Sequence, residues 1–263
     1  MKKLVIENST IAYVDQGEGE PIVLLHGFCG SSRYWEKVIH ELSTIYRVIV
    51  PDLPGHGQSD PFKYECTIDD FAEKLKALMD QLNIQTVTMF GHSLGGYISL
   101  AFAEKYSDRL KGFSLVHSTA FPDSDEAKKG RAANAEKIKK DGIQPFIEGL
   151  IPKLFAPDNQ NKTYVETAKE IGFTTSPKGA RSTLIAMKDR PDRNKVLEET
   201  NLPVLLIAGE HDQIIPAEKT FSVRKSNIRQ SVIKNVGHMS MYEDPKELLS
   251  DMKLFLSNIY ECC

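Results

Sequence analysis

One serine in the sequence has neighbours suited to nucleophilic chemistry. Ser93 lies in "FGHSLGGYIS", between Gly91 and Gly95, after an apolar run and before helix-forming residues. A serine hydroxyl is a weak nucleophile near neutral pH, so it needs a base and a turn that presents it. The glycines allow a sharp turn from strand to helix, and a helix N-terminus favours developing negative charge. The G-x-S-x-G pattern therefore predicts that Ser93 is a nucleophile.

Two further residues are suited to activate Ser93. His238 follows the last predicted strand in "NVGHMSMYEDP", and Asp212 follows the preceding strand in "AGEHDQIIP". The carboxyl ends of parallel strands meet at one edge of a sheet, so the three side chains should lie together there. We predict a catalytic triad in which His238 accepts the Ser93 proton and Asp212 orients the imidazole.

Other residues remain candidates for the base and the acid. His211 lies next to Asp212, and Asp123 lies six residues beyond His117, where another predicted strand ends. A triad acid after that earlier strand is the alternative to Asp212. We expect His117 and His92 to serve mainly in packing or behind the reacting groups.

An anion-stabilising loop is predicted in "LLHGFCGSS". Gly27 lets the backbone turn after the apolar run, so that the N–H of Phe28 can point at Ser93. Together with the N–H of Leu94 it would form an oxyanion hole with two donors. Cys29 has no base assigned to it and is expected to pack as a small residue.

The elements around these residues alternate between strands and helices. Eight apolar runs predict strands at 3–7, 10–15, 21–27, 46–52, 86–91, 110–117, 202–210 and 230–236, with a turn at Asn8–Ser9. Helical patterns cover 31–43, 67–82 and 245–259, and Thr67 with Asp70 approximates a capping box. Buried strands that alternate with helices predict an α/β fold with a mostly parallel eight-stranded sheet and helices on both faces.

The segment 119–200 interrupts this alternation. It is polar, contains six prolines and has no strong strand pattern. We predict a helical cap at 119–200, with helices at about 123–141, 143–154, 158–172 and 177–189, inserted into a core domain of 1–118 and 201–263. Four apolar cap residues have helical spacing and are candidates for substrate contact: Phe121, Phe146, Leu150 and Met187. For most of them, packing onto the core is the alternative. His92 of the core is a further candidate for substrate contact.

The composition argues against several functional classes. The 263 residues contain 33 Lys and Arg against 36 Asp and Glu, without a basic cluster that includes aromatic residues, so we expect no nucleic-acid partner. No run approaches the ~20 apolar residues of a membrane span, and the first residues lack the apolar stretch of a secretion signal. We therefore expect a cytoplasmic protein without a membrane partner, as a monomer or a homodimer.

The cysteines and histidines do not predict a metal site. The four cysteines and seven histidines lack zinc-ligand spacing, so we expect no metal, no cofactor and no disulfide framework. The terminal pair Cys262 and Cys263 is compatible with a lipid-attachment signal, but a frayed tail is the simpler interpretation.

The chain resembles the α/β-hydrolase family over nearly its whole length. The matching segments are "HGFCGSS", "DLPGHGQSD" (52–60), "GHSLGG", "GEHDQIIP" and "VGHMSMYEDP", in the family's order. The resemblance implies the α/β-hydrolase fold with a helical cap, and a mainly structural role for Asp52 and His56. "AMKDRPDR" (186–193) is similar to the end of the cap in small carboxylesterases and lactonases of this family.

The leading hypothesis is a serine hydrolase that cleaves small or medium carboxylic esters or lactones through an acyl-enzyme, without a cofactor. Epoxide hydrolases and haloalkane dehalogenases resemble the chain, but they have an aspartate nucleophile on the strand-to-helix turn, called the nucleophile elbow, where this chain has Ser93. One alternative is a lyase similar to the menaquinone-pathway succinyl-cyclohexadiene carboxylate synthase, whose tyrosine and arginine at the elbow are replaced here by His92 and Tyr97. The other is a ligand receptor that keeps the triad.

Overall fold

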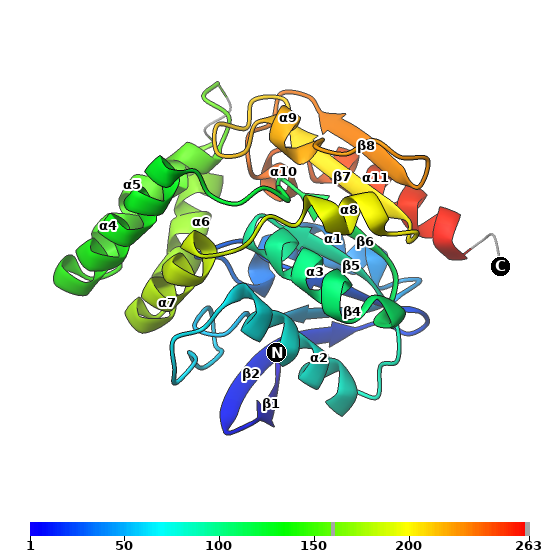
Figure 1. The fold of residues 1–263 in the computed structure, drawn as a ribbon, viewed down its shortest axis with the longest axis horizontal. Helices are drawn as coiled ribbons and strands as arrows, with labels where there is room; N and C mark the ends of the chain where they lie inside the picture. Colours follow the sequence, from blue (N-terminus) through cyan, green and yellow to red (C-terminus); the bar gives the residue numbers. More distant parts are fainter. Residues whose placement is uncertain (159–160, 261–263) are drawn as a thin grey trace.

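A single eight-stranded sheet forms the centre of the protein, seen in a computed structural model that describes residues 1–158 and 161–260 (Figure 1). The strands are β1 (Lys2–Ile6), β2 (Ser9–Gln16), β3 (Pro21–Leu25), β4 (Arg47–Pro51), β5 (Val87–His92), β6 (Leu110–Val116), β7 (Val204–Gly209) and β8 (Ile228–Ile233). Their order is β1-β2-β4-β3-β5-β6-β7-β8, with β1 and β2 antiparallel to their neighbours and β3 to β8 parallel. The eight predicted strands and the mostly parallel sheet are confirmed.

The turn between β1 and β2 lies one residue earlier than we predicted. Its central residues are Glu7 and Asn8, with φ of 50° and 60°, whereas Ser9 already belongs to β2 and pairs with Ile6. Two successive residues with positive φ make a hairpin turn whose twist matches that of the strands. Asn tolerates this left-handed backbone well, which explains why the turn includes Asn8 and excludes Ser9.

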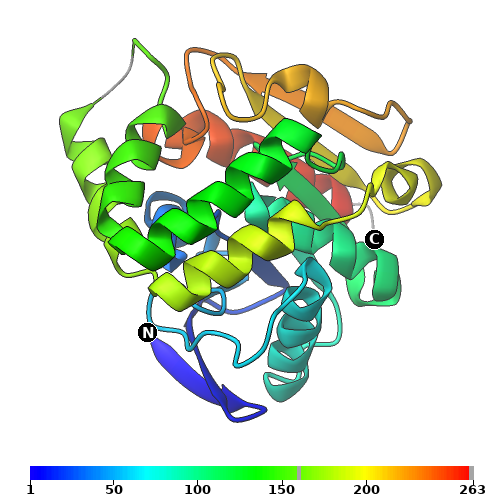
Figure 2. The same ribbon diagram turned by 60° about the vertical axis from the view of Figure 1, so that its left-hand side comes forward.

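Helices cover both faces of the sheet and form a separate group beside it (Figures 1 and 2). They are α1 (Glu36–Leu42), α2 (Ile68–Gln81), α3 (Leu94–Lys105), α4 (Asp125–Asp141), α5 (Gln144–Leu150), α6 (Lys162–Phe173), α7 (Pro177–Lys188), α8 (Asn194–Glu199), α9 (Ala217–Thr220), α10 (Ser240–Glu243) and α11 (Pro245–Tyr260), with the 3-10 helices η1 (Ser32–Trp35), η2 (Ser107–Arg109) and η3 (Ile151–Leu154). The predicted capping box of α2 is present: Asp70 N donates to Thr67 Oγ1 at 3.2 Å, and Thr67 N donates to Asp70 Oδ2 at 2.7 Å.

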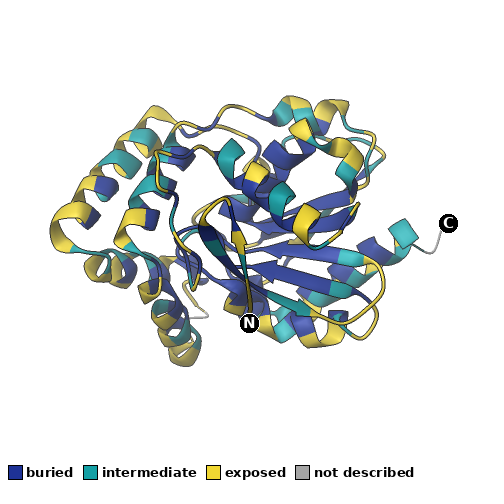
Figure 3. Cartoon of the chain, turned by 90° about the horizontal axis from the view of Figure 1, so that it is seen from below, coloured by how far each residue is buried: buried dark blue, intermediate teal, exposed yellow. Residues whose placement is uncertain are grey.

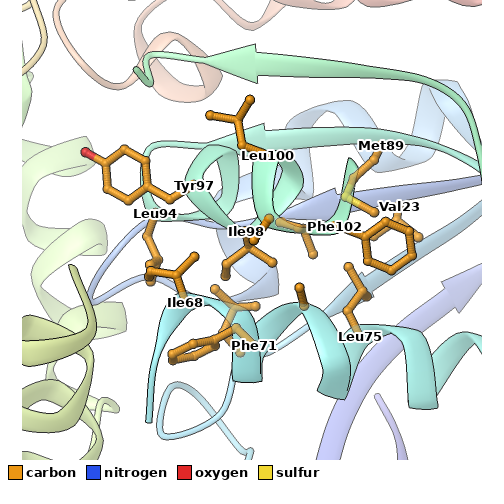
Figure 4. Packing of buried hydrophobic residues seen from close by; sticks show 14 of the residues in the cluster. Val23, Ile68, Phe71, Leu75, Met89, Leu94, Tyr97, Ile98, Leu100 and Phe102 are labelled. Atoms are coloured by element: carbon orange, nitrogen blue, oxygen red, sulfur yellow. The ribbon is translucent and has the colours of Figure 1, made fainter. Parts of the chain in front are cut away.

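Side chains of the central strands pack alternately into two cores. In β3, Val23 belongs to the core with α2 and α3, whereas the neighbouring Leu24 belongs to the core with α1 and α11. Figure 4 shows the first core, in which Phe71 of α2 packs against Ile98 of α3. Successive side chains of a strand point to opposite faces, so a strand covered on both sides must be apolar throughout. This double burial holds the strand ends that carry the candidate site.

Helices α4 to α7 lie together at one side of the sheet, between β6 and β7 in the chain (Figures 1 and 2). They correspond to the four predicted cap helices, with η3 completing the second. Helix α8 was not predicted; it returns to the core and contacts α3. Figure 3 shows exposed residues along the outer sides of the cap helices, whereas the central strands β3 to β7 are almost entirely buried.

Polar and backbone contacts dock the cap on the core. The backbones of Gly55 and Gly179 touch, since a Cβ atom on Gly179 would lie 2.5 Å from the Gly55 Cα. Arg193, at the end of the cap, is buried and donates to Asp69 at 2.9 Å and to Glu104 at 2.9 Å. One loop of the core and the helices α2 and α3 therefore meet the cap at defined points.

No helix in residues 1–158 or 161–260 is long and apolar enough to cross a membrane.

Candidate active site

Ser93 stands on a strained turn between β5 and α3. Its backbone has φ of 51° and ψ of −110°, a region that residues other than glycine rarely adopt. The Ser93 N–H donates to Val116 O at 2.9 Å, and Ser118 Oγ donates to the Ser93 carbonyl at 2.7 Å. The residue stays partly exposed at the carboxyl edge of the sheet. These contacts hold the serine in a conformation that its own preferences disfavour.

The glycines around Ser93 are required by close packing. A Cβ atom on Gly91 would lie 2.3 Å from the carbonyl oxygen of Gly95, and one on Gly95 would lie 2.5 Å from that of Leu25. Real side chains do not approach backbone atoms so closely, so any larger residue would displace β3, β5 or α3. The G-x-S-x-G spacing therefore follows from how this turn packs against the sheet.

The imidazole of His238 is hydrogen-bonded to the carboxylate of Asp212. His238 Nδ1 lies 2.7 Å from Asp212 Oδ2, and Asp212 Oδ1 accepts the N–H groups of Ile214 and Ile215 at 2.8 and 2.9 Å. Burial alone would raise the pKa of Asp212, but the imidazoles of His238 and His117 outweigh it and hold that pKa well below its ordinary value. An ionised carboxylate at Nδ1 favours the tautomer that leaves Nε2 of His238 free to accept a proton.

His92 holds the loop of His238 against the turn of Ser93. The His92 Nε2–H donates to the His238 carbonyl at 2.9 Å, and the two ring centroids are 4.9 Å apart. Since His92 directly precedes Ser93, this contact brings His238 to the nucleophile turn. Burial and the neighbouring imidazoles keep the pKa of His92 well below its ordinary value, so it is neutral. The residue is 1% exposed.

A second imidazole lies against Asp212. His117 Nδ1 is 3.3 Å from Asp212 Oδ2, and His117 Nε2 is 2.7 Å from Ser240 Oγ. We expected His117 to pack or to lie behind the reacting groups, and did not connect it with the acid. The rule that located Asp212 applies to His117 as well, because it follows β6 at the same edge of the sheet.

The N–H groups of Phe28 and Leu94, the predicted oxyanion donors, donate to no protein acceptor within the residues that the structure describes. The Phe28 loop runs directly beside the nucleophile turn, because a Cβ atom on Gly27 would lie 2.6 Å from His92 Nδ1 and 3.3 Å from Ser93 Cβ. Leu94 is the first residue of α3, where the helix dipole favours negative charge.

A family model described as "alpha/beta hydrolase fold" matches residues 20–245. The chain belongs to the α/β-hydrolase family. It is 28% identical to "Lipase 3" from Moraxella sp. (strain TA144) over 260 residues, which cover 92% of this chain and 78% of the lipase. A thermophilic esterase from Thermogutta terrifontis, solved with malate bound, superposes with a TM-score of 0.93 at 30% identity over 98% of both chains. The enol-lactonase from Burkholderia xenovorans LB400 shares the fold, with a TM-score of 0.89 at 22% identity over 97% of this chain and 100% of the other.

In this α/β-hydrolase, two buried histidines support the loops beneath the site. His26 Nδ1 donates to Gly27 O at 2.8 Å, and its Nε2 accepts the N–H of Leu53 at 2.9 Å. The His56 ring lies 5.3 Å from that of His26. Burial lowers the pKa of His26 to about 4, and burial with the nearby His26 lowers that of His56 to about 3. Both are neutral at pH 7 and hold loops together.

The four predicted substrate contacts of the hydrolase's cap lie in different environments. Phe146 packs against Phe28, with ring centroids 5.9 Å apart, so it lies beside the predicted oxyanion loop. Leu150 and Phe146 line a cavity of about 200 Å³ between α4 and α5. Phe121 is 38% exposed, whereas Met187 is buried in the core with α2 and α3. A larger cavity of about 560 Å³ lies between 63–66 and the helices α4 and α7, and no triad residue lines it.

The structure separates the alternative acid from His238. Asp123 Oδ1 accepts Arg190 Nη1 at 2.6 Å, and Arg131 pairs with the same carboxylate. These arginines keep the pKa of Asp123 below its ordinary value in spite of partial burial, which would raise it. The carboxylate at His238 Nδ1 is that of Asp212.

The remaining histidine and cysteine candidates lie apart from this arrangement. The side chain of His211 is 45% exposed. Cys29 is fully buried, and burial raises the pKa of its thiol, so the thiolate is strongly disfavoured. Cys262 and Cys263 lie outside the described residues.

Two imidazoles and one carboxylate of the site carry donor atoms of the kind that metal ions bind. Among the described residues, His117, Asp212 and His238 are the group whose donor atoms lie within 4.8 Å of one another. Nδ1 of His238 already hydrogen-bonds Asp212 Oδ2 at 2.7 Å, so this pair is suited to holding and transferring a proton.

Proposed function

We propose that this α/β-hydrolase cleaves small or medium carboxylic esters or lactones through a covalent acyl-enzyme. The observation that carries the proposal is the 2.7 Å hydrogen bond between His238 Nδ1 and Asp212 Oδ2, beside the strained turn of Ser93. This pair leaves Nε2 of a neutral imidazole as a proton acceptor, which a serine nucleophile requires. The lipase and esterase relatives support ester hydrolysis at the level of the family.

In the acylation step, Ser93 Oγ attacks the carbonyl carbon of the ester while His238 Nε2 takes the serine proton. The electron pair of the C=O bond moves to its oxygen, which the N–H groups of Phe28 and Leu94 bind. Asp212 stabilises the imidazolium. The tetrahedral intermediate then breaks its bond to the leaving oxygen, which takes the proton from His238; in a lactone this hydroxyl stays attached to the acyl group.

In the deacylation step, water replaces the alcohol. His238 takes one proton from the water, whose oxygen attacks the acyl carbon. The second tetrahedral intermediate expels Ser93 Oγ, which recovers its proton from His238, and the carboxylic acid leaves. Each cycle returns the free enzyme and consumes one water, so the mechanism requires no cofactor.

One residue of the cap supports a role in the choice of substrate. Phe146 packs against Phe28 beside the predicted oxyanion loop, so its ring would form part of the wall of the acyl site. The cavity of about 200 Å³ that Phe146 and Leu150 line is also lined by Asn134, Lys137 and Lys153 and by no triad residue, so it sets no limit on acyl length. Contacts of His92, Phe121 and Met187 with the substrate stay predictions.

The proposal is tested with chromogenic esters from acetyl to decanoyl and with the Ser93→Ala variant. We expect steady release of product by the wild type and loss of turnover in Ser93→Ala, whose fold is checked by circular dichroism. A phosphonate reagent should label the Ser93 peptide in the wild type. Turnover retained in Ser93→Ala, or labelling at another serine, would reject the mechanism.

Mass spectrometry of the intact chain separates hydrolysis from the alternatives. A receptor would release one equivalent of product and keep an adduct on Ser93 or His238. A lyase would leave every ester intact and would still eliminate a leaving group from its own substrate. We expect many turnovers and no lasting adduct.

A further inference from the structure

We propose that His117 is a positioning residue of the triad, whose Nδ1–H shares the Oδ2 atom of Asp212 with His238. The inference rests on the proposed function, because sharing this oxygen affects the reaction of Ser93 only if His238 is its base. Two imidazole nitrogens converge on Oδ2, at 2.7 Å from His238 and 3.3 Å from His117. The side chains of His117 and Asp212 are 0% exposed, so no solvent weakens this contact.

The surroundings of His117 determine where its proton lies. Within the described residues Nδ1 makes no well-aligned hydrogen bond, and the nearest charge is the Asp212 carboxylate. A lone pair on Nδ1 would repel that carboxylate at 3.3 Å, whereas an N–H is attracted to it. Nε2 then accepts the hydroxyl proton of Ser240 at 2.7 Å. Burial lowers the pKa of His117 and Asp212 offsets this only in part, so the imidazole is neutral at pH 7.

His117 also connects three loops of the site. Its N–H donates to Ile207 O at 2.8 Å, its Nδ1 faces the loop after β7, and its Nε2 contacts Ser240, two residues after His238. The backbone φ of 49° is unusual for a residue other than glycine and persists only where the surroundings enforce it. The contacts of one buried side chain therefore hold the acid and the loop of the base in register.

Sharing Oδ2 has an electrostatic consequence for the base. A carboxylate oxygen that accepts two N–H donors stabilises each of them less, and the positive end of the His117 N–H opposes positive charge on His238. The imidazolium of His238 is therefore stabilised less than it would be by Asp212 alone. The other titratable groups near the pair are His92, behind His238, and Glu243, which accepts backbone N–H groups of the same loop.

Two substitutions distinguish the role of Nδ1 of His117 from the role of its Nε2. In His117→Asn, the amide nitrogen takes the place of Nδ1, and Asn tolerates positive φ. In His117→Gln, the longer amide reaches the place of Nε2 and Ser240 but has no donor at Oδ2. The experiment measures kcat/KM against pH on a chromogenic ester for both variants, with the exposed His40→Gln as a control.

We expect His117→Asn to keep the acid limb of the wild type, which is the rise of kcat/KM with pH on the acidic side of the profile, and to lose about threefold in kcat/KM. His117→Gln should move that limb to higher pH by about half a unit to one unit and lose roughly tenfold at pH 7, the effect of one hydrogen bond to a charged group. An unchanged limb in His117→Gln, or an equal shift in His117→Asn, would overturn the proposal, since a role in packing alone predicts no such difference.

A measurement on the wild-type protein covers variants that fail to fold. Nitrogen-15 NMR of labelled histidines should show His117 protonated at Nδ1 and unprotonated at Nε2 from pH 6 to 8. A proton at Nε2 would overturn the proposal whatever the activity. If the Nδ1 tautomer is present but no ester is cleaved, the proposed function fails and the placement of His117 stands.

Discussion

Asp212 Oδ2 lies 2.7 Å from His238 Nδ1, although 26 residues separate them in the chain. Each residue follows one of two adjacent parallel strands, β7 and β8, so their loops emerge side by side at the carboxyl edge of the sheet. Ser93 reaches the same edge at the end of β5. The parallel sheet thus places three residues from distant parts of the chain at one edge.

Substituting each carboxylate in turn should show whether Asp212 or Asp123 is the acid of the triad. Asp212→Asn is expected to lower kcat by about 10⁴, because an amide at Nδ1 can stabilise the wrong tautomer of His238. The carboxylate of Asp123 pairs with arginines and not with His238, so Asp123→Asn should retain far more activity per folded molecule. Steady-state kinetics on one chromogenic ester compares the two. A severe loss confined to Asp123→Asn would show that we chose the wrong acid.

The cap should influence the preferred acyl length. Phe146→Ala removes the ring that packs on Phe28 and should shift the preference toward longer acyl chains. The change should be gradual, because each methylene contributes about 1–3 kcal/mol to discrimination. Phe173→Ala is the matched control, since Phe173 is an exposed phenylalanine of the cap. The same length profile in both variants would remove Phe146 from the specificity argument.

Arg193 should stabilise the junction of cap and core. Arg193→Leu leaves Asp69 and Glu104 without their buried partner, and we expect the free energy of unfolding to fall by about 1–3 kcal/mol. Lys195→Leu removes an exposed pair with Glu199 and should change it by less than about 0.5 kcal/mol. Urea unfolding at pH 7.5 measures both. Equal stabilities would mean that Arg193 does not secure the cap.

Stability should fall as the pH drops from about 6.5. His26 and His56 are neutral in the fold, with pKa values of about 4 and about 3, whereas in the unfolded chain they become protonated near pH 6.5. The unfolded state therefore binds more protons below that pH, and each histidine lowers stability by up to about 1.4 kcal/mol per pH unit. The effect continues to about pH 4 for His26 and about pH 3 for His56.

Urea unfolding between pH 8 and 5 isolates this effect from most carboxylates, which titrate at lower pH. Stability should be nearly constant above pH 7 and decline below 6.5. His40→Gln changes an exposed histidine and should leave the dependence unaltered. Constant stability down to pH 5 would show that the buried histidines accept protons in the fold.

Several features of the hydrolase follow from short stretches of sequence. The apolar runs predicted eight strands, all of which form, and the capping pair of Thr67 and Asp70 marks the start of α2. The glycines around Ser93 indicated the strand–turn–helix elbow that the structure contains. These features depend on neighbours within a few residues, because backbone preference, hydrophobic period and capping are local properties.

The partners of the charged and polar side chains were decided by the tertiary structure. Asp212 and Asp123 both follow strands at the carboxyl edge, and the sheet order with the arginines of the cap determines which one meets His238. The contact of His117 with Asp212 spans 95 residues of sequence, since 212 − 117 = 95, and the strand that ends before His117 predicts its place at the carboxyl edge but not this partner. Such contacts depend on how separate strands align and where loops settle, and no local pattern records either.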